Sequence, residues 1–272
     1  MRSAVPNEPF ELALFASDLV VVRDAVAGGV ATVVVDWEND GKQARQAAAD
    51  TEINSHTVDD LRLAREATRA RLLCRINRFG PSTPDEVETA LAAGADELLL
   101  PMVRTAAEVE SVLNQVSGRA GTGILVETLE AVAAASELAC LPLSRVYVGL
   151  NDLSIARGTP TIFAPLVDGL LDELRGQFAG VRFGFGGLTL PDAGAPIPCR
   201  LLVGEVARLR AGFTFLRRSF YRDVSGRDVS REVPRILGAV ETARARAPEA
   251  EARDRDELLG LLAPRPAHVA LA

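Results

Sequence analysis

The sequence predicts an α/β protein folded as a single-domain (β/α)8 TIM barrel, on three observations. Eight short apolar runs rich in β-branched residues recur along the 272 residues, and segments with helical periodicity lie between them. Polar residues come directly after four of these runs, where a strand sealed beneath helices leaves the core. These four clusters are Asp36-Trp37-Glu38, Arg75-Ile76-Asn77, Glu127-Thr128 and Asn151-Asp152. In such a barrel the carboxyl ends of the strands meet at one face, which carries the chemistry.

The eight apolar runs give the expected strands in chain order. The run VATVVVDW is the clearest, because parallel strands covered by helices are hydrophobic on both faces. Strands that alternate with helices require a mostly parallel sheet, and eight of them favour closure into a barrel. The expected strands are 10–16, 30–37, 71–76, 98–103, 122–128, 145–150, 181–188 and 213–220.

Capping residues and helical spacing place the helices between these strands. Ser17-Asp18 offers N-cap side chains for a helix that ends at Gly28-Gly29. Thr83-Pro84-Asp85-Glu86 is a helix start with acids at the positive end of the helix dipole, and Gly94 closes that helix. The expected helices are 18–28, one starting at 57, then 83–94, 105–117, 129–139, 162–178, 198–211 and 228–246. The polar stretch 39–54 is expected to hold a short helix and an extra turn.

The catalytic domain is expected to span 1–246, and residues 247–272 to form a loose tail or a helix that contacts a second subunit. The net charge of -7 and the pI near 5.1 argue against a nucleic-acid partner, which needs a basic face. The first ten residues lack the apolar core of a signal peptide, and no apolar run reaches the roughly 18 residues of a membrane span. We therefore expect a cytoplasmic protein without a membrane partner.

The three cysteines, Cys74, Cys140 and Cys199, are widely spaced and form no CxxC motif. Cys74 lies in an apolar strand, where a reduced, buried thiol behaves as a small hydrophobic residue. We expect neither disulfides nor a zinc site.

Four segments in this order resemble the HpcH/HpaI aldolase and citrate lyase β-subunit family, over roughly residues 10–225. They are Cys74-Arg75-Ile76-Asn77, Leu100-Pro101-Met102-Val103 followed by Glu108-Val109, Gly123-Ile124-Leu125-Val126-Glu127-Thr128, and Val148-Gly149-Leu150-Asn151-Asp152-Leu153-Ser154. The resemblance implies a (β/α)8 barrel that makes or breaks a carbon–carbon bond next to a carboxylate. It also implies a divalent metal held by a Glu and an Asp, which match Glu127 and Asp152, and a substrate-binding arginine, which matches Arg75.

Two carboxylates at neighbouring strand ends suit Mg²⁺ or Mn²⁺, with water and substrate oxygens completing an octahedron. A bound metal would act as a Lewis acid for the enolate that forms when the carbon–carbon bond breaks. The structural alternatives are a first-turn acid for Glu127 and an N-cap for Asp152. For Arg75 the two alternatives are a bidentate clamp on a substrate carboxylate and an internal salt bridge to Glu38 or Glu127.

Glu38 is the second candidate catalytic residue, either as an acid that transfers protons or as a group that orients Arg75. The segment Asp36-Trp37-Glu38-Asn39-Asp40-Gly41 is not a calcium loop, because its twelfth position is Ala47. The sequence departs from the family at Asn39, where one group of relatives has a histidine and another has an aspartate. An imidazole base would therefore come from His56, for which a surface or capping role is the alternative.

The expected substrate-binding residues are Arg75, Asn77, Pro101, Gly186 and Gly187. The glycines end the seventh strand, and Arg217-Arg218 lies on the expected eighth. In many barrels the loops after these two strands bind phosphate through backbone N–H groups. The alternative is that the glycines only relieve crowding and the arginines pair with acids.

Three functions are compatible with these residues. The first is a divalent-metal-dependent carbon–carbon lyase of the class II aldolase type, acting next to a 2-keto carboxylate such as pyruvate. The second is an acyl-CoA lyase or thioesterase like the citrate lyase β-subunit, although a basic groove for CoA is not evident beyond Arg217-Arg218 and Arg222. The third is a degenerate barrel that serves as a binding subunit. The relatives commonly form trimers or hexamers, so we expect a homo-oligomer.

Overall fold

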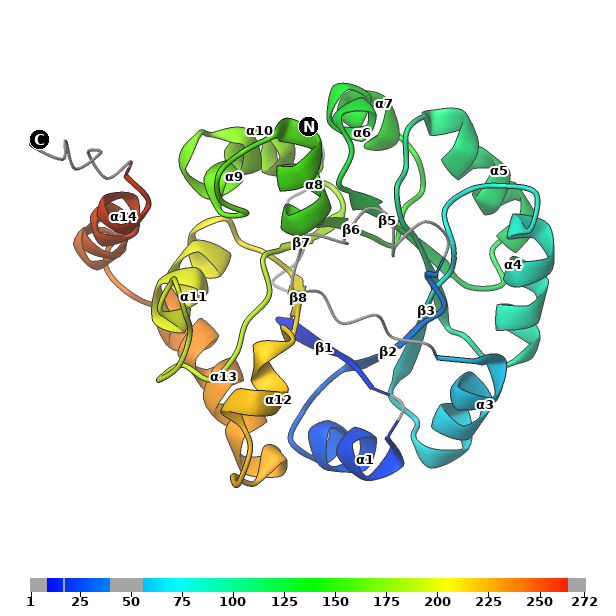
Figure 1. Cartoon of the computed structure of the whole chain (residues 1–272), viewed down its shortest axis with the longest axis horizontal. Coiled ribbons are helices and arrows are strands. Elements are labelled where there is room, and N and C mark those ends of the chain that lie inside the picture. The colour runs from blue at the N-terminus through cyan, green and yellow to red at the C-terminus, as the bar shows by residue number, and fades with distance from the viewer. Residues whose placement is uncertain (1–8, 17, 40–55, 264–272) are drawn as a thin grey trace, which may run out of the picture.

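Eight parallel strands close into a barrel in chain order within the residues that the computed structural model describes, 9–16, 18–39 and 56–263 (Figure 1). Each strand pairs with the next along the chain, and the last returns to the first. The strands are β1 (Glu11–Phe15), β2 (Thr32–Asp36), β3 (Arg71–Arg75), β4 (Glu97–Leu100), β5 (Gly121–Val126), β6 (Arg145–Val148), β7 (Arg182–Phe185) and β8 (Phe213–Phe215). The predicted (β/α)8 barrel is confirmed.

Successive side chains of each strand enter two separate hydrophobic cores, because they point to opposite faces of the sheet. The larger core lies between the strands and the surrounding helices. The smaller core fills the barrel, and its members are Ala13, Val34, Leu73, Leu99, Leu125, Tyr147, Phe213 and Phe215. At this level β7 supplies Gly184, where a Cβ atom would lie 2.7 Å from the ring of Phe213. The glycine therefore makes room for the aromatic ring that fills its side of the barrel.

The helices surround the strands on the outside of the ring (Figure 1). Asp18 caps the first helix by accepting from Val20 N at 2.8 Å, and Thr57 forms a capping box with Asp60 at the next helix, so both predicted starts are confirmed. The helices are α1 (Leu19–Ala27), α3 (Val58–Ala67), α4 (Thr83–Ala92), α5 (Ala106–Val116), α6 (Leu129–Ala133), α7 (Ala135–Leu138), α8 (Leu150–Arg157), α9 (Ala164–Val167), α10 (Leu170–Gln177), α11 (Cys199–Arg208), α12 (Ser219–Asp223), α13 (Val229–Arg244) and α14 (Pro248–Leu262).

Two predicted helices are each broken into two. The predicted helix 162–178 is α9 and α10, because Gly169 between them adopts φ 88°, a left-handed conformation that a continuous helix excludes. The predicted helix 129–139 is α6 and α7, which meet at Ala134 with ψ near 5°. The predicted short helix and turn within 39–54 fall on residues 40–55, outside the described residues.

Several predicted strands run past the observed ends, and two of them run into helices that the sequence analysis missed. β6 ends at Val148 and α8 begins at Leu150, while β8 ends at Phe215 and α12 begins at Ser219. Leu150 and Phe220 are buried although both lie in helices. Hydrophobicity therefore does not mark where strand pairing stops, because short helices bury the same residue types at the end of the barrel.

Residues 248–262 form α14, which packs on α11 at the outside of the barrel (Figure 1). Leu258 is fully buried in this contact region, and Arg255 Nη1 pairs with Glu205 Oε2 on α11 at 2.5 Å. Among the described helices, none combines the length and the apolar composition of a membrane span.

Charged side chains close the amino-terminal end of the barrel. Arg145 Nε donates to Glu97 Oε1 at 2.7 Å, and Arg145 Nη2 lies 2.6 Å from Glu97 Oε2. The side chain of Arg145 is 3% exposed and that of Glu97 is 0% exposed, and Ser144 also donates to Glu97. Gly123 gives them room, because a Cβ atom there would lie 2.7 Å from Arg145 Cγ. The inward-facing layer beneath the hydrophobic core is thus a buried ion pair.

We predict that Glu97→Ala lowers the free energy of unfolding by about 3–5 kcal/mol, because it leaves Arg145 charged and buried without its closest partner, with Glu11 Oε2 as the remaining carboxylate oxygen at 3.6 Å. Urea unfolding followed by circular dichroism measures the change. The matched control is Glu88→Ala, which removes the exposed partner of Arg119 and should change stability by less than about 1 kcal/mol. Equal effects of the two substitutions would contradict the conclusion that the ion pair between Glu97 and Arg145 stabilises the barrel floor.

Candidate active site

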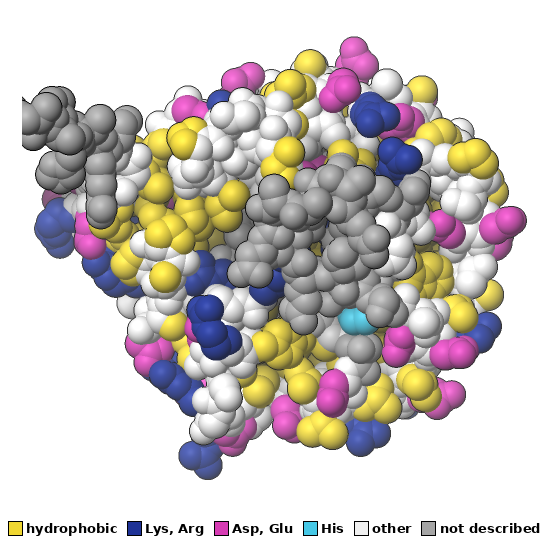
Figure 2. Space-filling view, in the orientation of Figure 1, with side chains coloured by type: hydrophobic (Ala, Val, Ile, Leu, Met, Phe, Trp, Pro, Cys, Tyr) yellow, Lys and Arg dark blue, Asp and Glu magenta, His cyan; other side chains and the backbone are white. Residues whose placement is uncertain are grey.

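A cavity of about 690 Å³ opens at the carboxyl ends of the strands. Side chains from β1, β3, β5, β6 and β8 and from the loops that follow them line it. On this face of the molecule, basic side chains gather around α11 and α12 next to hydrophobic ones (Figure 2). The cavity therefore lies where the sequence predicted the polar clusters to meet.

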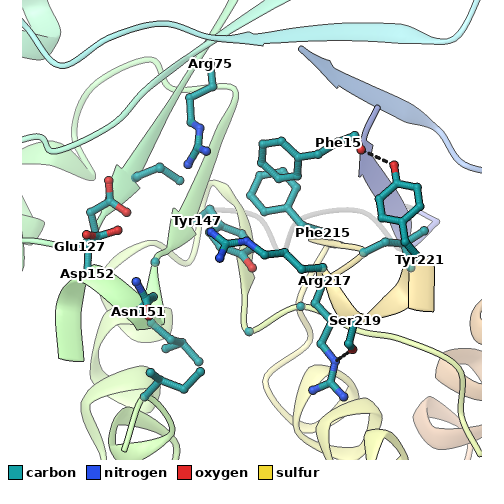
Figure 3. Close-up of a pocket in the computed structure, with 18 of the residues that line it drawn as sticks. Phe15, Arg75, Glu127, Tyr147, Asn151, Asp152, Phe215, Arg217, Ser219 and Tyr221 are labelled. Carbon is teal, nitrogen blue, oxygen red and sulfur yellow. Dashed lines mark hydrogen bonds between the residues drawn. The ribbon is translucent and has the colours of Figure 1, made fainter. Parts of the chain in front are cut away.

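Glu127 and Asp152 lie side by side in the cavity wall, with their carboxylates close together (Figure 3). Glu127 follows β5 in the inward-facing register of Leu125, is 4% exposed, and accepts a hydrogen bond from Met102 N at 2.9 Å. Asp152 lies in the first turn of α8. Two residues far apart in the sequence are thus brought together at adjacent strand ends.

The pKa of Glu127 is raised to about 8, first by burial and then by the negative charges of Asp152 and Glu38. The hydrogen bond from Met102 and the charge of Arg75 act in the opposite direction but are outweighed. Burial and the two neighbouring carboxylates therefore favour the protonated form of Glu127 in the metal-free site.

Gly149, which the sequence analysis did not single out as a site residue, determines where Glu127 lies. A Cβ atom at position 149 would lie 2.4 Å from Glu127 Oε2 and 2.9 Å from Glu127 Cβ. Met102 is the second missed residue, since its φ of 52° turns its N–H toward the Glu127 carboxylate. The resembling segments contain both residues, but only the packed barrel shows that they touch Glu127.

Arg75 lies at the end of β3 and is held by two carboxylates. Its Nε and Nη2 donate to the two oxygens of Asp36 at 2.8 and 2.6 Å, and its Nη1 lies 3.2 Å from Glu38 Oε2. Burial alone would lower the pKa of Arg75, but Asp36 and then Glu38 raise it above its ordinary value. The internal salt bridge to Glu38 is therefore present, Asp36 is a partner that the sequence analysis missed, and the guanidinium still lines the cavity.

His56 also lines the cavity, although the sequence favoured a surface or capping role. Its Nδ1 accepts a hydrogen bond from Asp36 N at 3.0 Å. A ring nitrogen that accepts must be unprotonated, so in this arrangement the imidazole is neutral and carries its proton on Nε2. Asp36 thus contacts His56 through its backbone and Arg75 through its carboxylate.

Asn77, Pro101 and Glu38 lie outside the lining of the cavity as far as the chain is described. The side-chain amide of Asn77 donates to Glu86 Oε1 at 2.9 Å and accepts from Asn39 N at the same distance, so it joins two loops. Pro101 is buried next to Met102. A substrate contact for Asn77 and Pro101 stays a prediction.

Gly186 and Gly187 also line the cavity, and their φ angles are 83° and 95°. Tyr147 at the base of the cavity packs its ring on Phe215 at 4.3 Å, and burial raises the pKa of its hydroxyl. Tyr147 and Phe215 therefore give the cavity an apolar base.

The donor set fits a hard divalent cation that the protein holds by two carboxylates. Among the described residues no group of three or more His, Cys, Asp or Glu side chains forms a metal cage. Mg²⁺ usually keeps several water ligands and is bound through one or two carboxylates plus substrate oxygens, and Glu127 with Asp152 matches this requirement. A cation there would also favour the ionised form of Glu127, whose pKa is raised by burial and then by the charges of Asp152 and Glu38.

The fold and the cavity define a TIM barrel with the site architecture of an enzyme. The model of the HpcH/HpaI aldolase/citrate lyase family matches residues 14–162, more than half of the chain, and the protein belongs to this family. Its members are enzymes of the lyase and aldolase type that bind small carboxylate substrates and generally depend on a divalent metal. The predicted family is confirmed.

Solved structures share the fold. RipC from Yersinia pestis is 15% identical with a TM-score of 0.55, and the match covers 89% of this chain and 97% of that chain. The citrate synthase SbnG is 18% identical with a TM-score of 0.58, and the match covers 80% of this chain and 91% of that chain. Comparison with curated proteins finds no matching sequence. At these identities the similarity shows the fold alone.

We predict that the metal-free protein loses stability as the pH rises from about 4.5 to about 8, because Glu127 is protonated in the folded state and ionised in the unfolded state across this window. The folded state then binds more protons than the unfolded state, so each rise in pH favours unfolding. Glu127→Gln keeps the neutral form and should flatten this fall, whereas Glu110→Gln, an exposed control, should not. Parallel stability curves for wild type and Glu127→Gln in chelator-treated samples would contradict the raised pKa.

We predict that Gly149→Ala lowers the free energy of unfolding by about 1–3 kcal/mol, because its methyl group overlaps the Glu127 side chain. Glu127→Ala removes the overlap, so the two changes together should lower stability by less than the sum of their separate effects. Gly176→Ala is the control, since its Cβ atom meets nothing within 4 Å. Urea unfolding measures these changes. If the effects of the two substitutions on the free energy of unfolding add up, the overlap is relieved by residues other than Glu127 and the prediction is contradicted.

Proposed function

We propose that this protein is a divalent-metal-dependent carbon–carbon lyase of the class II aldolase type, which cleaves or forms a bond next to a 2-keto carboxylate such as pyruvate. The observation that carries the proposal is the pair of facing carboxylates, Glu127 and Asp152, in the same cavity as Arg75. Membership in a family of lyase and aldolase enzymes supports it.

Glu127 and Asp152 would hold Mg²⁺ or Mn²⁺. The bound cation would supply Lewis-acid stabilisation of the negative charge that develops on the substrate as the carbon–carbon bond breaks. Met102 N donates to the Glu127 carboxylate, and Gly149 leaves the space that the carboxylate occupies. These two neighbours would therefore orient Glu127 as a metal ligand.

Arg75 would bind the carboxylate of the 2-keto acid. A guanidinium has five N–H groups, and Asp36 and Glu38 engage its Nε, Nη1 and Nη2 atoms from the side of β2. These contacts hold the plane of the guanidinium so that its remaining N–H groups meet a substrate in the cavity. Glu38 is therefore proposed as a positioning residue for Arg75, because it contacts the guanidinium and lies outside the lining of the cavity as described, while proton transfer by Glu38 stays a prediction.

His56 would act as a neutral hydrogen-bond donor through Nε2. The bond from Asp36 N occupies the lone pair on Nδ1, so in this arrangement the proton of the ring lies on Nε2. A donor of this kind stabilises negative charge on a substrate oxygen. The homo-oligomeric state and a subunit contact through residues 247–272 stay predictions.

We predict that Asp152→Asn and Glu127→Gln each lower kcat/KM for pyruvate release from a 4-hydroxy-2-keto acid by more than about a hundredfold, since the cation supplies several kcal/mol to the transition state. Mn²⁺ should raise the Tm of the wild type by mass action, and neither variant should show this rise. Asp59→Asn, an exposed control on α3, should keep both properties.

A wild type without Mn²⁺-dependent stabilisation and without pyruvate release would contradict the proposal and favour a barrel that serves as a binding subunit. Binding of a CoA thioester by isothermal titration, together with turnover of that thioester, would instead favour the acyl-CoA lyase.

A further inference from the structure

The guanidinium of Arg75 lies over the ring of Phe15. Arg75 Cζ is 5.0 Å from the centroid of that ring, within the range of a cation–π contact. The two residues end β3 and β1, which are separated in the barrel by β2. Both line the cavity, and Figure 3 shows their side chains pointing toward one another. The contact therefore depends on closure of the barrel and joins residues that are distant in the sequence.

The polar contacts of Arg75 hold its guanidinium by the edge. Asp36 accepts from Nε and Nη2, and Glu38 lies 3.2 Å from Nη1. Because a bidentate carboxylate lies near the plane of a guanidinium, it leaves the group able to tilt about the axis between them. The ring of Phe15 covers one face of the group, so a tilt toward that face is blocked. The edge contacts and the face contact together define the plane of the guanidinium.

Other aromatic residues hold Phe15 in place. The centroid of its ring is 4.9 Å from that of Phe215, which in turn lies 4.3 Å from that of Tyr147. Phe215 and Tyr147 are both buried and belong to the core inside the barrel. The hydroxyl of Tyr221 donates to Phe15 O and holds the end of β1 (Figure 3). The ring of Phe15 therefore has little freedom to move away from Arg75.

Burial strengthens the contact between Arg75 and Phe15. The side chain of Arg75 is 15% exposed, and that of Asp36 is 0% exposed. A cation over a ring gains more where water is excluded, and the gain corresponds to about twofold in an equilibrium constant at exposed sites and about thirtyfold at desolvated ones. The orientation of the guanidinium should therefore depend measurably on the presence of the ring.

We propose that Phe15 is a positioning residue, which sets the plane of the Arg75 guanidinium so that its N–H groups meet the carboxylate of a 2-keto acid. The inference rests on the proposed function and assigns Phe15 a role in substrate affinity. An aromatic face attracts the cation without occupying an N–H group in the guanidinium plane, whereas a third carboxylate would compete with the substrate for these donors. The ring thus orients Arg75 and leaves its remaining donors to the ligand.

A purely structural role for Phe15 makes a different prediction, and Phe10 provides the matched control. Phe10 precedes β1 and also carries an arginine on its ring, since Arg244 Cζ lies 5.4 Å from the ring centroid. This second pair lies outside the lining of the cavity as described. If such contacts only stabilise the barrel, Phe15→Leu and Phe10→Leu both lower the free energy of unfolding, and neither changes the affinity for a carboxylate.

The first measurement uses the full chain without substrate. Rotation of the Arg75 guanidinium about its Nε–Cζ bond is measured by NMR exchange spectroscopy with isotope-labelled arginine, and Arg75→Lys assigns the signal. We expect this rotation to be about two- to thirtyfold faster in Phe15→Leu than in the wild type, and unchanged in Phe10→Leu. Phe15→Tyr keeps the aromatic face and should restore the slow rotation.

The second measurement is the affinity for pyruvate in the presence of Mn²⁺, by isothermal titration. We expect Phe15→Leu to bind pyruvate about two- to thirtyfold more weakly, and Phe15→Tyr and Phe10→Leu to bind it like the wild type. The Mn²⁺-dependent rise in Tm should persist in Phe15→Leu, because Phe15 acts on Arg75 and not on the proposed metal ligands. Circular dichroism checks folding, and Phe15→Met provides the same comparison if Phe15→Leu does not fold.

Unchanged rotation in Phe15→Leu, or unchanged affinity of this variant in a protein that binds pyruvate, would overturn the inference. Equal losses of affinity in Phe15→Leu and Phe10→Leu would also overturn it, because affinity would then follow stability. Faster rotation in Phe15→Leu, in a protein that binds no pyruvate, would support the positioning of Arg75 by Phe15 and contradict the proposed lyase.

Discussion

Closure of eight parallel strands forces alternate side chains into one narrow interior, and the rest of the structure depends on how that interior is filled. The middle level is apolar, and Gly184 makes room there for Phe213. Two residues earlier in the same register, Glu97 and Arg145 pair at the floor. Two residues later, β5 continues to Glu127 at the mouth. One alternation of side chains thus produces a closed base, a packed core and an open polar site.

The charged side chains at the floor of the barrel and those at its mouth differ in their burial and in their partners. At the floor, Arg145 and Glu97 form an ion pair and are almost fully buried. At the mouth, Asp36 and Glu38 pair with Arg75, while burial and the charges of Asp152 and Glu38 raise the pKa of Glu127. A perturbed pKa in a cavity is typical of a functional site. The proposed metal site follows from this difference.

Much of the fold and part of the site were predictable from local patterns. All eight strands were found because buried parallel strands are continuously apolar. The start of α1 was found because Asp18 is a capping residue, and that of α3 because the apolar residues after Thr57 have helical spacing. The ends were not predictable at Leu150 and Phe220, where short helices bury the same residue types as strands. At the site, the position of Glu127 after β5 was visible in the sequence, whereas its contacts with Met102 and Gly149 were not. Those contacts join residues that lie about 25 positions apart on one side and about 22 on the other, and sequence patterns act over a few residues.

The sequence by itself determined the class of fold, the order of its strands and the cluster of polar residues at their carboxyl ends, because these depend on hydrophobic periodicity and on chain order. Only the tertiary structure decided the partners of each charge. It paired Arg75 with Asp36 as well as Glu38, turned Asn77 toward Glu86, placed His56 in the cavity wall with its Nδ1 engaged, and left Arg217 Nη2 without an acceptor in the described chain. The reason is that pairing depends on distances between strand ends, which the curvature and register of the closed barrel set and no local run of residues encodes.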